Sequence, residues 1–101
     1  MSNLRTLVES ELFKQQLESF DDLELMDEAL DAISWALARK PEECPIIPGT
    51  TGLRVIKTLR HERGGRVVPA LKVWFSIEDI NIVLLRAITR QDIEESADLD
   101  L

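Results

Sequence analysis

The chain has 101 residues, of which 45% are hydrophobic and 31% charged, a balance typical of one globular domain with a single core. Its net charge of −7 argues against nucleic-acid binding over the whole surface, and its one cysteine excludes an internal disulfide, which fits a cytoplasmic protein. The sequence has no Cys/His cluster with metal spacing, no phosphate-binding glycine motif and no membrane-length apolar run, so we expect no metal, no cofactor and no membrane partner.

The first forty residues predict a short strand and then two helices. Residues 3–9 have an apolar, extended pattern, and Ser10 can cap the helix that follows. That first helix carries apolar residues at spacings of four and three, Phe13, Leu17 and Phe20. The second helix is expected to begin at Asp22 and to end before Pro41. Its apolar residues recur as one stripe toward the core: Leu23, Met26, Leu30, Ile33 and Leu37.

Trp35 falls on the side of the second helix away from that stripe, among acidic residues. We therefore expect its indole to be largely exposed. An exposed tryptophan suits a protein interface, because aromatic anchors dominate binding at such surfaces. The alternative is that Trp35 packs under the first helix or the N-terminal strand.

A loop and three strands are expected after the helices. Residues 41–52 read as the loop because proline and glycine are concentrated there. From residue 53 the apolar period changes to two, which predicts strands at residues 53–60, 67–77 and 80–88. The turn at Gly64 and Gly65 joins the first two, and Pro69 is expected at the start or edge of its strand. The element order is therefore β-α-α-β-β-β.

Charge divides the chain into blocks. Residues 1–52 carry a net charge of −7, residues 53–90 carry +5 and the last eleven residues carry −5. A local basic block inside an acidic chain is compatible with nucleic-acid binding on one surface. We expect a single domain over residues 1–91. Residues 92–101 are expected to form an acidic, flexible tail that either solubilises the protein or folds back over the basic block.

Strand alternation places many basic residues on one sheet face. The apolar residues expected on the core face are Leu53, Val55, Leu59, Leu71, Val73, Phe75, Ile77, Val83, Leu85 and Ala87. The opposite face would then carry Arg54, Arg60, Lys72, Trp74 and Arg86. Cations beside a stackable indole are what single-stranded RNA binding requires, because phosphates need charge and unpaired bases need a flat partner. The alternative is a sheet face that is merely solvated.

Four other charged residues fit this arrangement less directly. Lys57 falls on the core-facing register, which indicates a bulge or a side chain that reaches solvent at an edge. Arg63 and Arg66 flank the double glycine and are interpreted as solvating the turn. His61 has the chemistry of an acid or base near neutral pH, but a lone loop histidine is more often a bystander.

Four segments then carry a resemblance: residues 8–13, residues 41–54 with Ile-Pro-Gly-Thr-Thr-Gly-Leu-Arg at 47–54, residues 63–66, and residues 82–90. Over residues 4–95 the chain resembles the RelE/ParE superfamily of type II toxin–antitoxin toxins, most closely its HigB-like branch. The resemblance implies an α+β fold, with both N-terminal helices on one face of a small antiparallel β-sheet. It also implies an endoribonuclease that inhibits translation by cleaving mRNA on the ribosome, with a cognate antitoxin as partner. A homodimer is compatible with it.

Within this resemblance the implied catalytic residues are Lys72, Arg86 and Arg90, and the implied RNA-binding residues are Arg54, Arg60 and Trp74. Lys72 matches the strand arginine of the family, with Arg66 as a competing match, and Arg90 matches the basic residue that ends the last strand. The tyrosine or histidine that assists catalysis in many members has no counterpart after it. Two alternatives follow: a ParE-type gyrase inhibitor, or a catalytically degenerate member that binds antitoxin or regulates.

Overall fold

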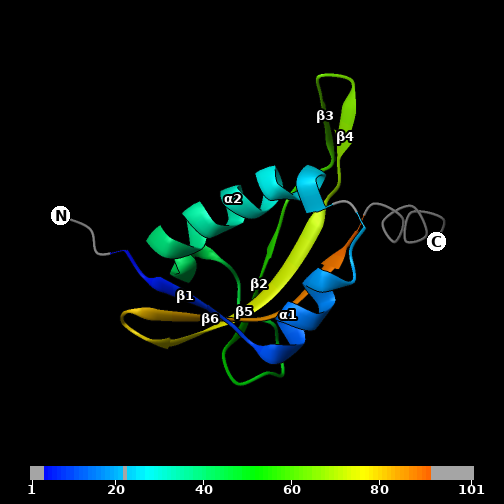
Figure 1. The fold of residues 1–101 in the computed structure, drawn as a ribbon. Helices are drawn as coiled ribbons and strands as arrows, with labels where there is room; N and C mark the ends of the chain where they lie inside the picture. The colour runs from blue at the N-terminus through cyan, green and yellow to red at the C-terminus, as the bar shows by residue number, and fades with distance from the viewer. Residues whose placement is uncertain (1–3, 22, 92–101) are drawn as a thin grey trace.

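The computed structural model, which describes residues 4–21 and 23–91, has the α+β architecture expected from the sequence, with one strand and two helices before the other strands (Figure 1). In this part of the chain five strands follow the helices, where the sequence pattern predicted three. The N-terminal half contains β1 (Thr6–Glu9), α1 (Glu11–Glu18), α2 (Leu23–Arg39) and the short 3-10 helix η1 (Pro41–Glu43). The remaining strands are β2 (Leu53–Lys57), β3 (His61–Arg63), β4 (Arg66–Val68), β5 (Leu71–Asp79) and β6 (Ile82–Arg90).

Four strands form the main sheet, in the order β1-β6-β5-β2. β5 is antiparallel to both β6 and β2, but β1 runs parallel to β6. The sheet is therefore mixed, whereas the family resemblance implied an antiparallel one. A parallel pair needs a long connection, and the chain between β1 and β6 supplies one.

The other two strands, β3 and β4, form a separate antiparallel hairpin that projects beyond the sheet (Figure 1). Gly64 and Gly65 at its turn have φ of 60° and 78°, a left-handed conformation that glycine adopts without steric cost. The single strand predicted over residues 67–77 is interrupted between β4 and β5, where Pro69 and Ala70 lie. Proline has no backbone N–H to give to a ladder, so the break falls at Pro69.

The two helices occupy different positions around the sheet. α2 lies across one face, and α1 lies along the edge of β6 where the short strand β1 has ended (Figure 1). Ser10 caps α1 as predicted, because Phe13 N–H donates to its Oγ over 3.1 Å. The same hydroxyl donates to the carbonyl of Arg86 at 3.0 Å, and Gln16 Oε1 accepts from Ile88 N–H at 2.9 Å. α1 thus pairs with the edge of β6 instead of sharing a face with α2.

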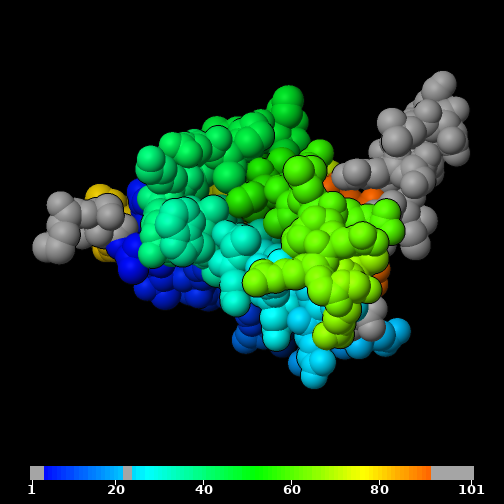
Figure 2. Space-filling model, turned by 90° about the horizontal axis from the view of Figure 1, so that it is seen from above, coloured from blue at the N-terminus to red at the C-terminus, as the bar shows by residue number. Residues whose placement is uncertain are grey.

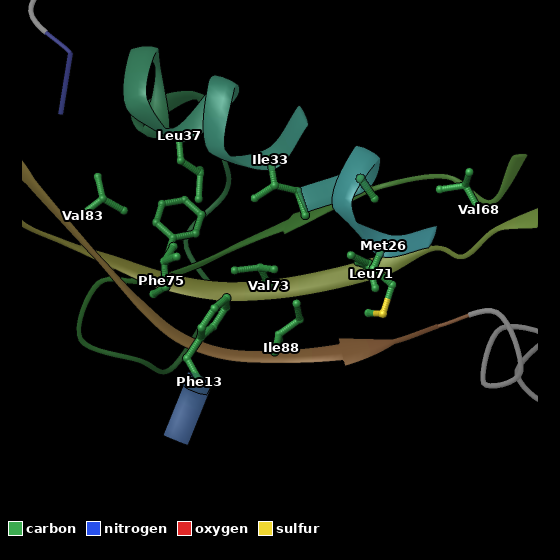
Figure 3. Packing of buried hydrophobic residues seen from close by; sticks show 12 residues of the cluster. Phe13, Met26, Ile33, Leu37, Val68, Leu71, Val73, Phe75, Val83 and Ile88 are labelled. Atoms are coloured by element: carbon green, nitrogen blue, oxygen red, sulfur yellow. The ribbon is translucent and has the colours of Figure 1, made fainter. Parts of the chain in front are cut away.

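The core lies between α2 and the sheet. Figure 3 shows Ile33 and Leu37 pointing from α2 toward Val73 and Phe75 of β5, while Phe13 enters from α1. Three residues of the predicted helix stripe, Met26, Ile33 and Leu37, are buried, and Leu30 packs partly buried against them. The predicted cap residue Asp22 lies outside the described residues.

Figure 2 views the molecule from the α2 side, where the helix and the segments that follow it cover the sheet. Over residues 4–21 and 23–91, neither helix combines the length and the hydropathy that a bilayer crossing requires. The predicted acidic tail, residues 92–101, falls outside the described part of the chain.

Candidate nucleic-acid interface

On the sheet face opposite α2, α1 borders only the edge at β6, and we call this face the open face. Strand register places Trp74 of β5 between Val55 of β2 and Ala87 of β6 on this face. Alternation on each side of this row adds the remaining side chains of the open face: Leu53, Lys57, Lys72, Ser76, Leu84 and Thr89. Glu78, at an irregularity of the β5–β6 pairing, joins them through its hydrogen bond with Ser76. Trp74 is half-buried, so its ring is supported by neighbours and still accessible.

Two lysines lie side by side next to Trp74. The Nζ of Lys72 is 4.8 Å from the centroid of the Trp74 ring, a cation–π contact. Lys57 is the direct cross-strand neighbour of Lys72. Neither lysine forms a salt bridge within the described residues. Like charges directly opposite each other on a sheet destabilise it, so this pair favours an anion between its ammonium groups. The sequence pattern had placed Lys57 on the core-facing register, and that placement was wrong.

Arg86 reaches the open face through a β-bulge. Leu85 pairs with Phe75 and Ala87 with Trp74, so Arg86 is the extra residue on β6. A bulge changes the direction in which a side chain points. The side chain of Arg86 is exposed and forms no hydrogen bond or ion pair with a described residue. The bulge also exchanges the predicted faces of the next two residues: Ile88 is 2% exposed in the core, and Ala87 lies beside Trp74.

The open face contains two adjoining depressions with Arg86 in the wall of both. The larger, about 640 Å³, is mainly apolar and lies between the sheet and α1: Ser10, Leu12, Gln16, Leu53, Trp74, Leu84, Arg86 and Ala87 line it. The smaller, about 280 Å³, is lined by Thr51, Leu53, Ser76, Glu78 and Arg86. In the smaller one, the hydroxyl of Ser76 donates to Glu78 Oε2 at 2.6 Å. Sequence reasoning missed both Glu78 and Lys57.

Arg54 is not part of this face. It is the cross-strand neighbour of the buried Phe75, and its guanidinium donates to the carbonyls of Cys44 at 2.6 Å and Glu42 at 3.2 Å. Arg54 therefore holds the segment after α2 against the sheet. The predicted alternation of β2 was wrong by one residue, since Ile56 packs against the core while Leu53 and Val55 lie on the open face.

Two further predicted cations also lie away from Trp74. Arg60 is exposed in the segment between β2 and β3, and the nearby Leu59, expected in the core, is 82% exposed. Arg90 is the cross-strand neighbour of the buried Leu71, so alternation assigns it to the α2 side of the sheet. The structure thus brings together Lys72, Trp74 and Arg86 and leaves Arg54, Arg60 and Arg90 outside.

A second charged cluster joins the β3–β4 hairpin to α2. Glu28 accepts hydrogen bonds from Arg63 and from His61 Nε2, the latter over 2.8 Å. The bond to Glu28 raises the pKa of His61, and the bond to His61 lowers the pKa of Glu28. His61 and Arg63 therefore make specific contacts instead of only solvating the turn. Because they face α2, they cannot serve chemistry at Trp74.

Trp35 is 62% exposed, which confirms the exposure predicted for it. The guanidinium of Arg39, one turn later, lies 4.2 Å from the centroid of the indole. A depression of about 440 Å³ opens next to this pair, lined by Trp35, Ala36, Arg39, Lys40, Glu43, Cys44 and Ile56. Burial raises the pKa of the Cys44 thiol, so this lining residue stays neutral.

Within the described ranges, no three or more His, Cys, Asp or Glu side chains gather as a metal site would require. No family model matches the chain, and no curated protein matches it either. The resemblance to the RelE/ParE superfamily therefore stays a prediction that rests on the four sequence segments.

Proposed function

We propose that the protein binds single-stranded RNA on the open face and acts as the toxin of a type II toxin–antitoxin module of RelE/HigB type, cleaving mRNA on cytoplasmic ribosomes. One observation carries the proposal: an accessible indole, Trp74, with Lys72 stacked on it and Arg86 in the same depression, on the sheet face opposite α2. The basic block of an otherwise acidic chain contributes three cations to this surface, the third being Lys57.

Each group supplies a different part of RNA recognition. The ring of Trp74 offers a stacking surface, and the apolar wall that includes Leu53 and Leu84 excludes water from a base placed there. Lys57 and Lys72 suit backbone phosphates as point charges. Arg86 presents a planar fork of donors that matches two phosphate oxygens, so it is the residue best suited to stabilise charge that develops on a phosphate during cleavage.

Expression in a bacterium tests this proposal. The unmodified protein is expected to slow growth, and primer extension on translated mRNA is expected to show cuts inside codons. Trp74→Ala and Arg86→Ala should each reduce both effects, because one removes the stacking surface and the other the phosphate contact. Arg66→Ala is the charge-loss control and also tests the competing family match. It should behave like the parent, because Arg66 lines a depression with Glu24 and Glu28 of α2 and neither depression of the open face. Growth arrest with intact mRNA and relaxed plasmids would favour the ParE-type alternative, and full-strength cleavage by the Arg86 variant would refute the proposed site.

The partner in this proposal is a cognate antitoxin that contacts Trp35. Its support is the exposed indole, held in place by Arg39 and next to a depression with apolar walls at Ala36 and Ile56. Co-purification with the product of a neighbouring gene is the test. Trp35→Ala should reduce the amount recovered, whereas Trp74→Phe, which changes the other tryptophan, should not. Equal recovery of both variants would remove Trp35 from the interface.

A further inference from the structure

We infer that Glu78 is the general base of the RNA cleavage proposed above, and that it takes the proton from the ribose 2′-hydroxyl; this inference rests on the proposed function. Cleavage through the 2′-hydroxyl requires an acceptor for that proton as well as charges that stabilise the phosphate. Lys57, Lys72 and Arg86 supply positive charge, but an ammonium or guanidinium group has no lone pair to accept a proton. The acceptor must be another side chain on the same face.

Glu78 lies where that acceptor is needed. It shares the smaller depression with Arg86, which also lines the larger depression that contains Trp74. Trp74 and Ser76 alternate along one face of β5. Glu78 follows at a second irregularity of the β5–β6 pairing, and the bond from Ser76 and the shared depression place it on the same side, with Arg86 lining the depressions of both Trp74 and Glu78. A base stacked on Trp74 would place the adjoining phosphate at Arg86 and the ribose hydroxyl toward Glu78.

The carboxylate of Glu78 is oriented by one hydrogen bond and has no ion-pair partner among the described residues. The hydroxyl of Ser76 donates to its Oε2 at 2.6 Å, which fixes one oxygen, and Oε1 has no hydrogen-bond partner among the described residues. Glu78 forms no salt bridge with a described cation. Among the residues that line the two depressions, Glu78 is the one acid.

Other carboxylates already have structural partners. Asp79, the next residue, accepts from Asn81 N–H at 2.7 Å in the turn between β5 and β6. Glu28 is bonded to the hairpin, and Glu42 is bonded to Arg5. Their lone pairs are engaged in holding the fold together. Glu78 is the carboxylate that combines a free oxygen with a place beside Arg86.

The reaction balances with water as the second proton donor. Glu78 takes the 2′-hydroxyl proton, and the 2′-oxygen attacks the adjacent phosphorus beside Arg86. The bond between phosphorus and the 5′-oxygen then breaks, and solvent water in the open depression protonates the departing oxygen. The products are a 2′,3′-cyclic phosphate and a 5′-hydroxyl. The proton on Glu78 returns to solvent, so the protein is unchanged after one turnover.

Single-turnover cleavage of an mRNA on purified ribosomes tests the inference with Glu78→Gln, which keeps the shape and removes the basic oxygen. We expect the cleavage rate to fall by about 10²- to 10⁴-fold, the usual contribution of a positioned acid–base group. Glu78→Asp should recover part of the rate. Glu62→Gln, on the exposed strand β3, is the matched control for loss of one negative charge and should cleave at the parent rate.

Binding is measured in parallel, with the same mRNA carrying 2′-deoxyribose at the cleaved nucleotide. A base that acts only on the proton leaves affinity unchanged, so Glu78→Gln should bind this RNA at least as tightly as the parent. Cleavage by Glu78→Gln within about threefold of the parent would overturn the role of Glu78 and leave the proposed function standing. Loss of affinity in parallel with cleavage would also overturn it, by showing a structural role. An uncut mRNA with the unmodified protein would reject the proposed function itself.

Discussion

Removing one cation from the open face should change the salt dependence of RNA binding by a calculable amount. For single strands, the slope of log affinity against log salt is about −0.7 for each phosphate neutralised. Lys57, Lys72 and Arg86 carry no salt bridge within the described residues, so all three can meet phosphates. Their joint slope is then about −2, which corresponds to about an 18-fold loss of affinity between about 50 and about 200 mM salt.

Lys57→Ala, Lys72→Ala or Arg86→Ala should each reduce the slope to about −1.4, so that the same change in salt weakens binding only about sevenfold. Fluorescence anisotropy with a labelled oligoribonucleotide across a salt series measures this directly. Arg66→Ala, which removes a cation from the hairpin, should keep the parent slope. An unchanged slope for all three open-face variants, or an equal reduction for Arg66→Ala, would refute the assignment of RNA to this face.

Three further outcomes are expected. Gln16→Ala should lower the free energy of unfolding by about 1–3 kcal/mol in a denaturant titration, because Ile88 N–H loses its acceptor at the edge of β6. The NMR titration of His61 should show a raised pKa that returns toward its ordinary value of 6.5 in Glu28→Gln. Because the pKa of His61 is raised in the folded protein, its contribution to stability is complete below its unfolded pKa and is lost as pH rises through its folded pKa. Because the pKa of Glu28 is lowered, its contribution to stability is lost as pH falls through its folded pKa. Deleting residues 92–101 removes five carboxylates and should tighten RNA binding, most clearly at low salt, and an unchanged affinity there would show that these charges do not compete.

The sequence predicted the helices well because their signals are local and repeated. The cap at Ser10 and the stripe through Met26, Ile33 and Leu37 each depend on residues within a few turns, and both are present. The alternation of β5 was also correct, since a nine-residue strand with one apolar face has an unambiguous phase. These features were enough to place Lys72 and Trp74 together.

The other parts of the site depend on how the strands pair with one another, which the alternation within a single strand does not determine. β2 has apolar residues on both faces, so its phase could not be read from the chain, and Arg54 and Lys57 were exchanged between faces as a result. The bulge at Arg86 shifts the faces after it, and a bulge follows from pairing with β5, not from local sequence. Glu78 was missed because the strand was expected to end at residue 77, one residue before it, whereas β5 continues to Asp79.

The position of α1 beside β6 also affects how the protein behaves at high concentration. A long strand with unpaired backbone groups is a template for strands of other molecules and for aggregation. β6 is nine residues long and pairs with β5 on one side. On its other side β1 covers the first half, and the side chains of Ser10 and Gln16 bond to backbone groups of β6 past the end of β1. The sheet therefore ends in two short strands, β1 and β2, of four and five residues, and its longest ladder is closed to intermolecular pairing.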